Sequence, residues 1–200
     1  GDFVITWQSA AQDGSGVGIA VLDSGVMKSH RSFDGALGDR VKRNVSMLNN
    51  SLANWTTGVD STSSLQPGSS ALNKYENSVA NDSAATLDGF GHGTHVASVA
   101  AGRPVTYNVA PDLTGIAPNA NLYDVKVLND MGLGTISDAM EGIQWVIYHA
   151  KEYNIRVMNL SLAAASTDSW QTDPLCKAVR SASAMGITVV VAAGNFGKNL

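Results

Sequence analysis

The sequence predicts an α/β protein with a doubly wound, mostly parallel sheet and helices on both faces of that sheet. Strand-like runs alternate along the chain with helix-like runs, which is the pattern of parallel strands joined by crossover helices. The strand-like runs are almost continuously apolar, as expected for strands that are buried on both faces. At 200 residues and 44% apolar content, the chain is long enough for one well-packed domain or for a piece of a larger one.

Four strands are expected from apolar runs rich in β-branched residues. The first run leads directly into Asp23, and the second leads into the turn-forming sequence Asn129-Asp130-Met131-Gly132. The expected strands cover residues 16–22, 121–128, 157–162 and 188–193.

Three helices are expected between these strands. Residues 94–101 form a short stretch that is rich in small side chains. Over residues 137–153 the apolar side chains recur at the spacing of one buried helix face, and Ser137 is the expected start. A third helix is expected over residues 174–185 and ends at Gly186.

Two segments are expected to lack regular structure. Residues 44–87 are dominated by Ser, Asn, Thr and Gly and show no sustained period, which predicts a flexible or lid-like surface insertion. Residues 103–118 contain three prolines and are interpreted as a second irregular connection. We therefore expect residues 1–200 to be part of a single domain that carries one surface insertion.

Composition and charge exclude several classes of partner. The formal net charge is -4, only 15% of residues are charged, and no basic run occurs, so neither nucleic acid nor a membrane surface is an expected partner. No apolar run approaches the length of a membrane span, and the first residues lack the features of a signal peptide. We expect that a targeting segment was removed or was never included. A protein or small-molecule substrate fits this composition better.

Polar side chains and bare backbone follow the strands at one predicted edge of the sheet. Asp23 follows the first strand, residues 132–134 follow the second, Ser161 closes the third and Asn195 follows the fourth. His92 stands at the start of the helix after the insertion. Since ligands of open parallel sheets bind outside the carboxyl ends of the strands, these segments predict one site.

Five segments together resemble the subtilisin-like serine proteases, the subtilase family. They occur in the family's order and span nearly the whole chain, and the acid-then-histidine order is recognised from that family. The segments are Ala20-Val21-Leu22-Asp23-Ser24-Gly25, His92-Gly93-Thr94-His95-Val96-Ala97, Gly115-Ile116-Ala117-Pro118, Val125-Lys126-Val127-Leu128 and Ala192-Ala193-Gly194-Asn195.

The resemblance implies a secreted, extracellular serine endopeptidase with a triad of Asp, His and Ser. Asp23 would orient the imidazole of His92, His92 would act as the general base, and Asn195 would donate to the oxyanion. The backbones of Gly132-Leu133-Gly134 and Ser161-Leu162-Ala163 would pair with an extended peptide substrate and make the enzyme broad in sequence preference. No cofactor is required by this mechanism.

The nucleophile is the part of the family pattern that these 200 residues do not contain. No segment resembling Gly-x-Ser-x-Gly or Gly-Thr-Ser-Met occurs before Leu200. We expect the serine on a carboxy-terminal part, as a separate chain after cleavage, and the fold to be incomplete without that part.

The sequence departs from the family at two further places. Ala163 and Ala164 stand where the family usually has two glycines, which predicts a narrower pocket and a preference for small residues beside the scissile bond. The calcium-binding loop that the family has after the histidine helix is not matched, so a structural Ca²⁺ has no support beyond Asp34 as a weak candidate ligand.

Two alternative functions stay open from the sequence. A catalytically incomplete subtilase-like domain could bind peptides in the same groove without cleaving them, although such a binder has no need of the full set Asp23, His92 and Asn195. A metal-dependent hydrolase could be built on His92 and His95, but the glutamate of the His-Glu-x-x-His pattern is missing. We expect no metal at these positions and interpret His95 as a packed residue of the helix.

Overall fold

Five parallel strands form the sheet, in the order β2-β3-β1-β4-β5. The computed structural model describes residues 13–33, 39–48, 67–103, 114–164 and 168–195. The central strand β1 (Gly18–Asp23) pairs with β3 (Asn121–Lys126) on one side and with β4 (Ile155–Leu160) on the other. The outer strands are β2 (Val41–Ser46), which pairs with β3, and β5 (Thr188–Val191), which pairs with β4.

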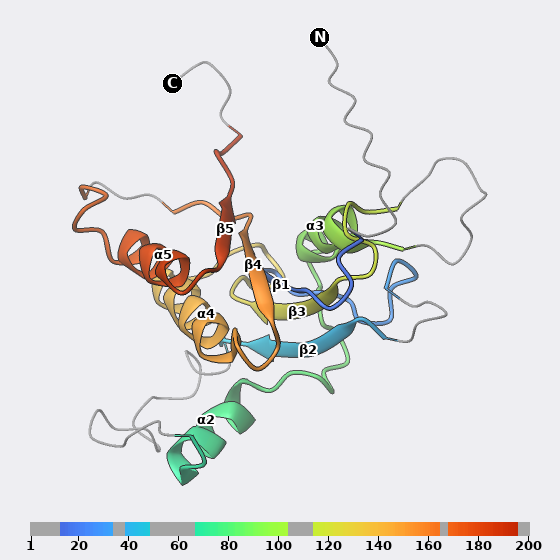
Figure 1. Cartoon of the computed structure of the whole chain (residues 1–200), viewed down its shortest axis with the longest axis horizontal. Coiled ribbons are helices and arrows are strands. Elements are labelled where there is room, and N and C mark those ends of the chain that lie inside the picture. Colours follow the sequence, from blue (N-terminus) through green and yellow to red (C-terminus); the bar gives the residue numbers. More distant parts are fainter. Residues whose placement is uncertain (1–12, 34–38, 49–66, 104–113, 165–167, 196–200) are drawn as a thin grey trace.

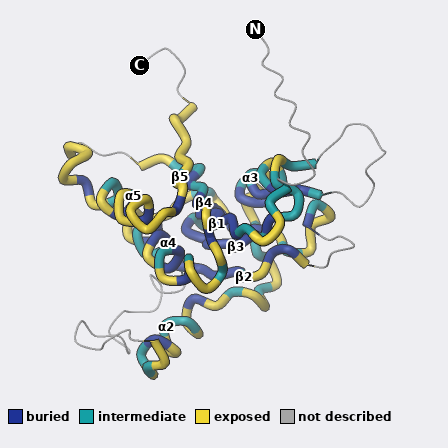
Figure 2. The backbone as a smooth tube through the Cα atoms, viewed as in Figure 1, coloured by how far each residue is buried: buried dark blue, intermediate teal, exposed yellow. Residues whose placement is uncertain are grey.

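Helices cover both faces of the sheet, which confirms the predicted fold class (Figure 1). Helix α3 (His92–Ala101) lies on one face, where Ala97 and Ala101 pack with side chains of β1 and β3. Helices α4 (Ile136–His149) and α5 (Pro174–Ala184) lie on the other face over the larger core cluster. All residues of β1 are buried, because this strand is covered on both faces and paired on both edges (Figure 2).

The predicted strands and helices exist, with shifted ends. The third strand begins at Ile155, two residues before its predicted start, and each of the strands β3, β4 and β5 ends two residues earlier than predicted. Helix α4 starts before Ser137, because Thr135 rather than Ser137 is its N-cap and exchanges hydrogen bonds with Asp138 in a capping box. Helix α5 begins at Pro174 and is capped by Asp173, whose side chain accepts from the Cys176 amide.

The segment 44–87 is more ordered than the sequence indicates. Its start belongs to β2, whose sequence Val-Lys-Arg-Asn-Val-Ser lacks regular alternation and is held in the sheet by pairing with β3. Helix α2 (Ser70–Val79) lies within the segment and is capped by Ser69. Only two α2 side chains are buried, so its apolar period is too weak to be recognised in the sequence. Residues 49–66 lie outside the described part of the chain, as do residues 104–113 of the second predicted irregular connection.

Helix α2 is tied to α4 through Glu76. The Glu76 carboxylate lies 3.1 Å from His149 Nε2 and accepts from the Trp145 indole N–H at 3.4 Å, while Glu152 lies 2.9 Å from His149 Nδ1. Burial acts to lower the pKa of His149, but these two carboxylates outweigh it and the net pKa is raised. The contact lies at the C-terminal end of α4. Among the described helices, none has the length and apolar character that would let it span a bilayer.

Candidate active site

Asp23 and His92, which the sequence predicts as partners, are in direct contact. His92 Nδ1 lies 2.8 Å from Asp23 Oδ1 and 2.9 Å from Asp23 Oδ2. Asp23 is the last residue of β1 and is completely buried, whereas His92 is the first residue of α3 and its side chain is 40% exposed. A neutral imidazole in this position donates from Nδ1 to the carboxylate, which leaves Nε2 as a free base.

The backbone around Asp23 is fixed from two sides. The carbonyl oxygen of Asp23 accepts from the amides of Val127 at 2.9 Å and Leu128 at 3.1 Å, just beyond the end of β3. Its carboxylate accepts from the Ser24 amide at 2.7 Å in addition to the imidazole. Lys126 Nζ donates to the Ser24 carbonyl at 2.7 Å and also reaches Asp130, at 2.8 Å. The turn after β1 is therefore attached to the end of the neighbouring strand.

Asp88 joins this turn to the start of α3. One carboxylate oxygen accepts from Ser24 Oγ at 2.9 Å and from the Gly91 amide at 2.7 Å, and the other accepts from the backbone and hydroxyl of Thr94. Burial acts to raise the pKa of Asp88, but these donors outweigh it and hold the pKa below its usual range. Asp88 thus supplies a negative charge at the amino end of α3 and links the turn after β1 to the start of that helix.

Gly93 allows the helix to approach the turn this closely. A Cβ added at Gly93 would lie 2.2 Å from the carbonyl oxygen of Gly25 and 3.0 Å from Asp23 Cβ. The Gly93 amide also donates to Ser24 Oγ at 3.1 Å. The glycine after His92 is therefore required for contact between α3 and β1 and not for flexibility of the helix.

Parts of both predicted peptide-binding segments line one cavity. Gly132, Leu133 and Gly134 belong to the loop after β3, in which the amides of Met131 and Leu133 both donate to Asn129 Oδ1. Ser161, Leu162 and Ala163 follow β4. A cavity of about 250 Å³ is lined by members of both segments, Gly134 from one and Leu162 and Ala163 from the other.

Phe90 lies between His92 and the loop after β3. Its ring centroid is 6.3 Å from that of His92, and its ring covers Gly132 so closely that a Cβ there would lie 2.8 Å from it. Half of the Phe90 side chain remains exposed. An apolar surface therefore continues from the imidazole to the groove segment 132–134.

Asn195 follows β5 at the same edge of the sheet as Asp23. All strands are parallel, so the residues after their carboxyl ends are on one side. Asn195 is exposed. The structure therefore brings Asp23 into contact with His92 and leaves Asn195 exposed after the end of β5.

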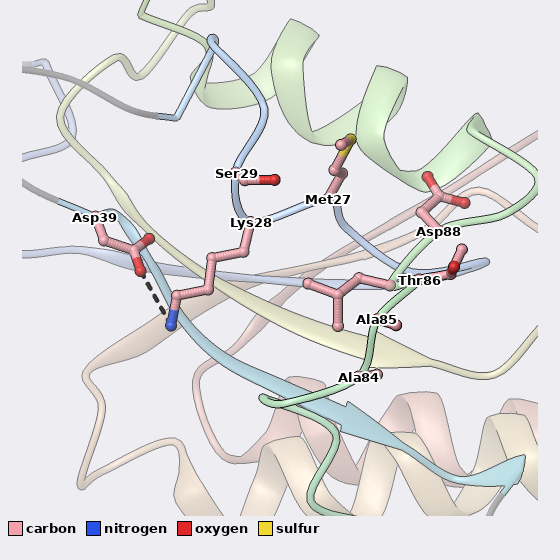
Figure 3. A pocket seen from close by; sticks show the side chains of 9 residues that line it. Met27, Lys28, Ser29, Asp39, Ala84, Ala85, Thr86 and Asp88 are labelled. Carbon is pink, nitrogen blue, oxygen red and sulfur yellow. Dashed lines mark ion pairs between the residues drawn. The ribbon is translucent and has the colours of Figure 1, made fainter.

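A separate cavity of about 670 Å³ lies between the turn after β1 and the segment that leads into α3. Figure 3 shows Asp88 at one end of it and the ion pair of Lys28 Nζ with Asp39 Oδ2, at 3.0 Å, at the other. Met27 and Thr86 are among the residues that line this space. The sequence does not indicate this cavity, because its walls come from segments without a motif.

The interpretation of His95 as a packed residue is wrong. His95 is exposed on α3, because the helix turns this position away from the sheet, and its amide donates to the carbonyl oxygen of Gly91. Within the described residues, no group of three His, Cys, Asp or Glu side chains could hold a metal ion. The candidate calcium ligand Asp34 lies outside the described residues.

Several residues of the site were missed from the sequence. Charged residues inside an apolar strand, Asp124 and Lys126, are a visible signal of a buried polar role. Asp88, a carboxylate just ahead of a helix start, is another. Phe90 carries no such signal, because an aromatic residue next to a glycine-rich segment is indistinguishable from a core residue in one sequence.

Comparison with known proteins agrees with the geometry. The family described as "Subtilase family" matches residues 14–200. The chain is 43% identical over 115 residues to serine protease AprX of Bacillus subtilis (strain 168), covering 55% of this chain and 26% of AprX. It is 44% identical over 112 residues to subtilisin DY of Bacillus licheniformis, covering 56% of this chain and 36% of that protein.

Among solved structures, sphericase superposes with a TM-score of 0.64 at 29% identity, covering 93% of this chain and 48% of sphericase. The chain thus spans about a quarter to a half of the length of these three relatives.

Proposed function

Because the chain belongs to the subtilase family, we propose that it forms the amino-terminal part of the catalytic domain of a serine endopeptidase. The observation that carries this proposal is the contact of His92 Nδ1 with the buried carboxylate of Asp23. A buried acid that engages one imidazole nitrogen and leaves the other at a half-exposed face is the arrangement of a general base. Peptide bonds of extended protein segments are the proposed substrates.

In the proposed mechanism His92 moves the proton. Nε2 takes the proton of a serine hydroxyl as its oxygen attacks the scissile carbonyl, and Asp23 stabilises the imidazolium that forms. The same nitrogen then gives the proton to the leaving amine, and the acyl group stays on the serine until water releases it. Asn195 would donate its amide N–H to the developing oxyanion, an interaction that is worth about 3 kcal/mol in subtilisin itself.

The groove would bind substrate through main-chain hydrogen bonds. Gly134 from the loop after β3 and Leu162 and Ala163 from the segment after β4 line two sides of one cavity, and Gly132, Leu133 and Ser161 are the proposed continuations of these two segments. Phe90 adds apolar surface next to His92, and the exposed side chain of Leu133 adds apolar surface on the loop after β3. This combination favours extended peptides with apolar side chains, without a strict sequence requirement.

The serine is proposed to lie on a carboxy-terminal part that packs on β5. Within the described residues β5 pairs on one edge only, and Val190 and Val191 are 47% and 61% exposed. An apolar cavity of about 500 Å³ beside it is lined by Leu160, Leu175 and Val191 among others. An open strand edge with exposed valines is a surface that proteins normally cover. We propose that the rest of the domain covers it, as a separate chain after cleavage.

Labelling with a fluorophosphonate tests the proposed function in the full-length protein. We expect one serine per molecule to be labelled, and the intact mass of the labelled species to tell whether the serine lies on the same or a second chain. His92→Ala is the control and should label at least a thousand times more slowly, because the serine then lacks its base. Absence of labelling together with retained peptide binding would contradict catalysis and favour the peptide-binding alternative.

We also propose an extracellular location, on the family resemblance alone.

The alanines after Leu162 are expected to restrict side chains next to the scissile bond. Ala163 and Ala164 line the cavity beside the groove, and their methyl groups take up space that glycines would leave free. A peptide library should show preference for small residues, and the double replacement Ala163→Gly with Ala164→Gly should raise kcat/KM for Phe or Tyr by about tenfold or more. Ala85→Gly, outside the groove, is the matched control. Efficient cleavage after Phe or Tyr by the unmodified protein would refute this prediction.

A further inference from the structure

Asn44 and Asp124 form a polar pair within the core of the sheet. They are register partners on β2 and β3, and both are completely buried. Asn44 Nδ2 donates to Asp124 Oδ2 at 2.7 Å and to the carbonyl oxygen of Val26 at 2.9 Å. The pair lies on the face of the sheet that α3 covers, because its partner Val26 packs in the core cluster between α3 and the sheet. Val26 belongs to the turn that follows Asp23.

Each side chain of the pair has one oxygen left without a donor. Within the described part of the chain, Asn44 Oδ1 and Asp124 Oδ1 accept no hydrogen bond. A buried acceptor without a donor costs free energy, and a buried carboxylate without a cation costs more. Both costs disappear if one proton is shared between these two oxygens, because the acid then donates from one oxygen and accepts at the other.

The surroundings of Asp124 disfavour a charge on it. Burial raises the pKa of Asp124 to about 8, in spite of opposing contributions from Asn44, the Val26 amide and Lys126. Two charged groups act on Asp124. Lys126, two residues further along β3, lowers its pKa but is already engaged by the Ser24 carbonyl oxygen and by Asp130. Asp88, which precedes α3, raises the pKa further.

The described residues that pack next to Asp124 on the neighbouring elements are uncharged. The neutral Asn44 faces it from β2, Val21 is its register partner on β1, and α3 contributes Ala97 and Ala101 to this cluster.

We propose that Asp124 carries a proton on Oδ1 and donates it to Asn44 Oδ1, so that a neutral acid–amide pair holds the turn after Asp23 through the Val26 carbonyl. The second N–H of Asn44 donates to the Val26 carbonyl oxygen, and Asp88, next to α3, accepts from Ser24 Oγ in the same turn. The pair is thus a positioning element for the turn that follows Asp23, built from two residues 80 positions apart. Loss of the proton leaves both of these oxygens without a donor and weakens this tether.

A protonated Asp124 makes the stability of the protein fall as the pH rises. The pKa of Asp124 in the folded protein, about 8, lies above its ordinary value of 3.8. Folding therefore takes up a proton between these two pH values, and the stability that the protonated pair contributes is complete below about pH 4 and is lost progressively up to about pH 8. Asp124→Asn keeps the shape and the donor and removes the titration.

Thermal unfolding of the full-length protein tests this between pH 4.5 and 9. Asp124→Asn should gain several degrees in Tm relative to the unmodified protein as the pH rises, with most of the gain reached by about pH 8. Asp39→Asn, a carboxylate at the surface, should run parallel to the unmodified protein. A difference for Asp124→Asn that stays constant or shrinks with rising pH would overturn the proposal. So would a Tm increase on adding Na⁺ or Ca²⁺ that Asp124→Asn abolishes, because a cation would then fill the gap.

Infrared spectroscopy supplies a second readout that does not depend on the variant being stable. The unmodified protein with isotope-labelled aspartate should show the C=O band of a protonated carboxylic acid at pH 7, and the band should shift in D₂O and disappear above pH 9. Asp124→Asn should lack it where that variant folds. Absence of the band at pH 7 in the unmodified protein would refute the proposal. Neither measurement requires peptidase activity, so its failure is distinguishable from failure of the proposed function.

Discussion

Replacing His92 by alanine in the full-length protein is expected to lower kcat by on the order of a million-fold, the loss in kcat that subtilisin itself shows when its triad histidine is removed. The reason is that His92 Nε2 is the base of the proposed mechanism, since Nδ1 is held by Asp23. The measurement is the rate of hydrolysis of a chromogenic peptide. Binding of the peptide is measured separately, so that a loss of catalysis is distinguished from a loss of binding. His95→Ala, on the same helix and exposed, is the matched control and should stay within about twofold.

The partner residue gives a graded version of the same result. Asp23→Asn keeps the shape of the side chain but turns the imidazole toward the wrong tautomer, so a loss of about ten thousand-fold is expected. Asp39→Asn removes a carboxylate outside the site and should change kcat/KM little.

The prediction for His92 has a clear contrary outcome. If His92→Ala retains more than one hundredth of the activity of the unmodified protein, His92 is not the general base.

Replacing Gly93 by alanine is expected to destabilise the protein by about 3 kcal/mol or more. Alanine is normally the better helix former by about 1 kcal/mol, so helix propensity alone predicts the opposite sign. Packing decides the outcome, because the added methyl would lie 2.2 Å from the Gly25 carbonyl and 3.0 Å from Asp23 Cβ. These are atoms of a fixed turn and a buried strand end, which cannot move without separating His92 from Asp23. Denaturant unfolding and kcat/KM should both register the change.

Gly91 provides the control for this prediction. It precedes α3 with a φ of +87°, and an added Cβ would meet no atom within 4 Å. Gly91→Ala should therefore cost only the strain of a left-handed backbone, about 1 to 2 kcal/mol. If Gly93→Ala costs no more than Gly91→Ala, the close approach of α3 to the turn is not what holds the site together.

The sequence predicted those elements whose pattern is local. The continuous apolar run before Asp23 marks β1, and the proline at the start and glycine after the end mark α5. It did not predict β2 or α2. The sequence Val-Lys-Arg-Asn-Val-Ser has no strand pattern of its own and forms a strand because it pairs with β3. A helix with two buried side chains has almost no apolar period.

The candidate site divides in the same way. Motif order in the sequence singled out Asp23 and His92, and their contact in the structure is consistent with the roles that the family resemblance implies. The role of Asn195 stays a prediction, as do those of the groove residues. Asp88 was missed because its partners Ser24 and Thr94 are recruited from two different elements.

By itself, then, the sequence determined the α/β class, most strands and helices, the family and the identity of the candidate acid and base. These follow from side-chain periods, turn residues and short motifs, which act between neighbours along the chain. Only the tertiary structure decided that Gly93 must be a glycine, that Asp88 links the turn to α3, and that Asn44 meets Asp124. Such contacts join residues about 60 to 80 positions apart and depend on the order of strands in the sheet, which no local pattern encodes.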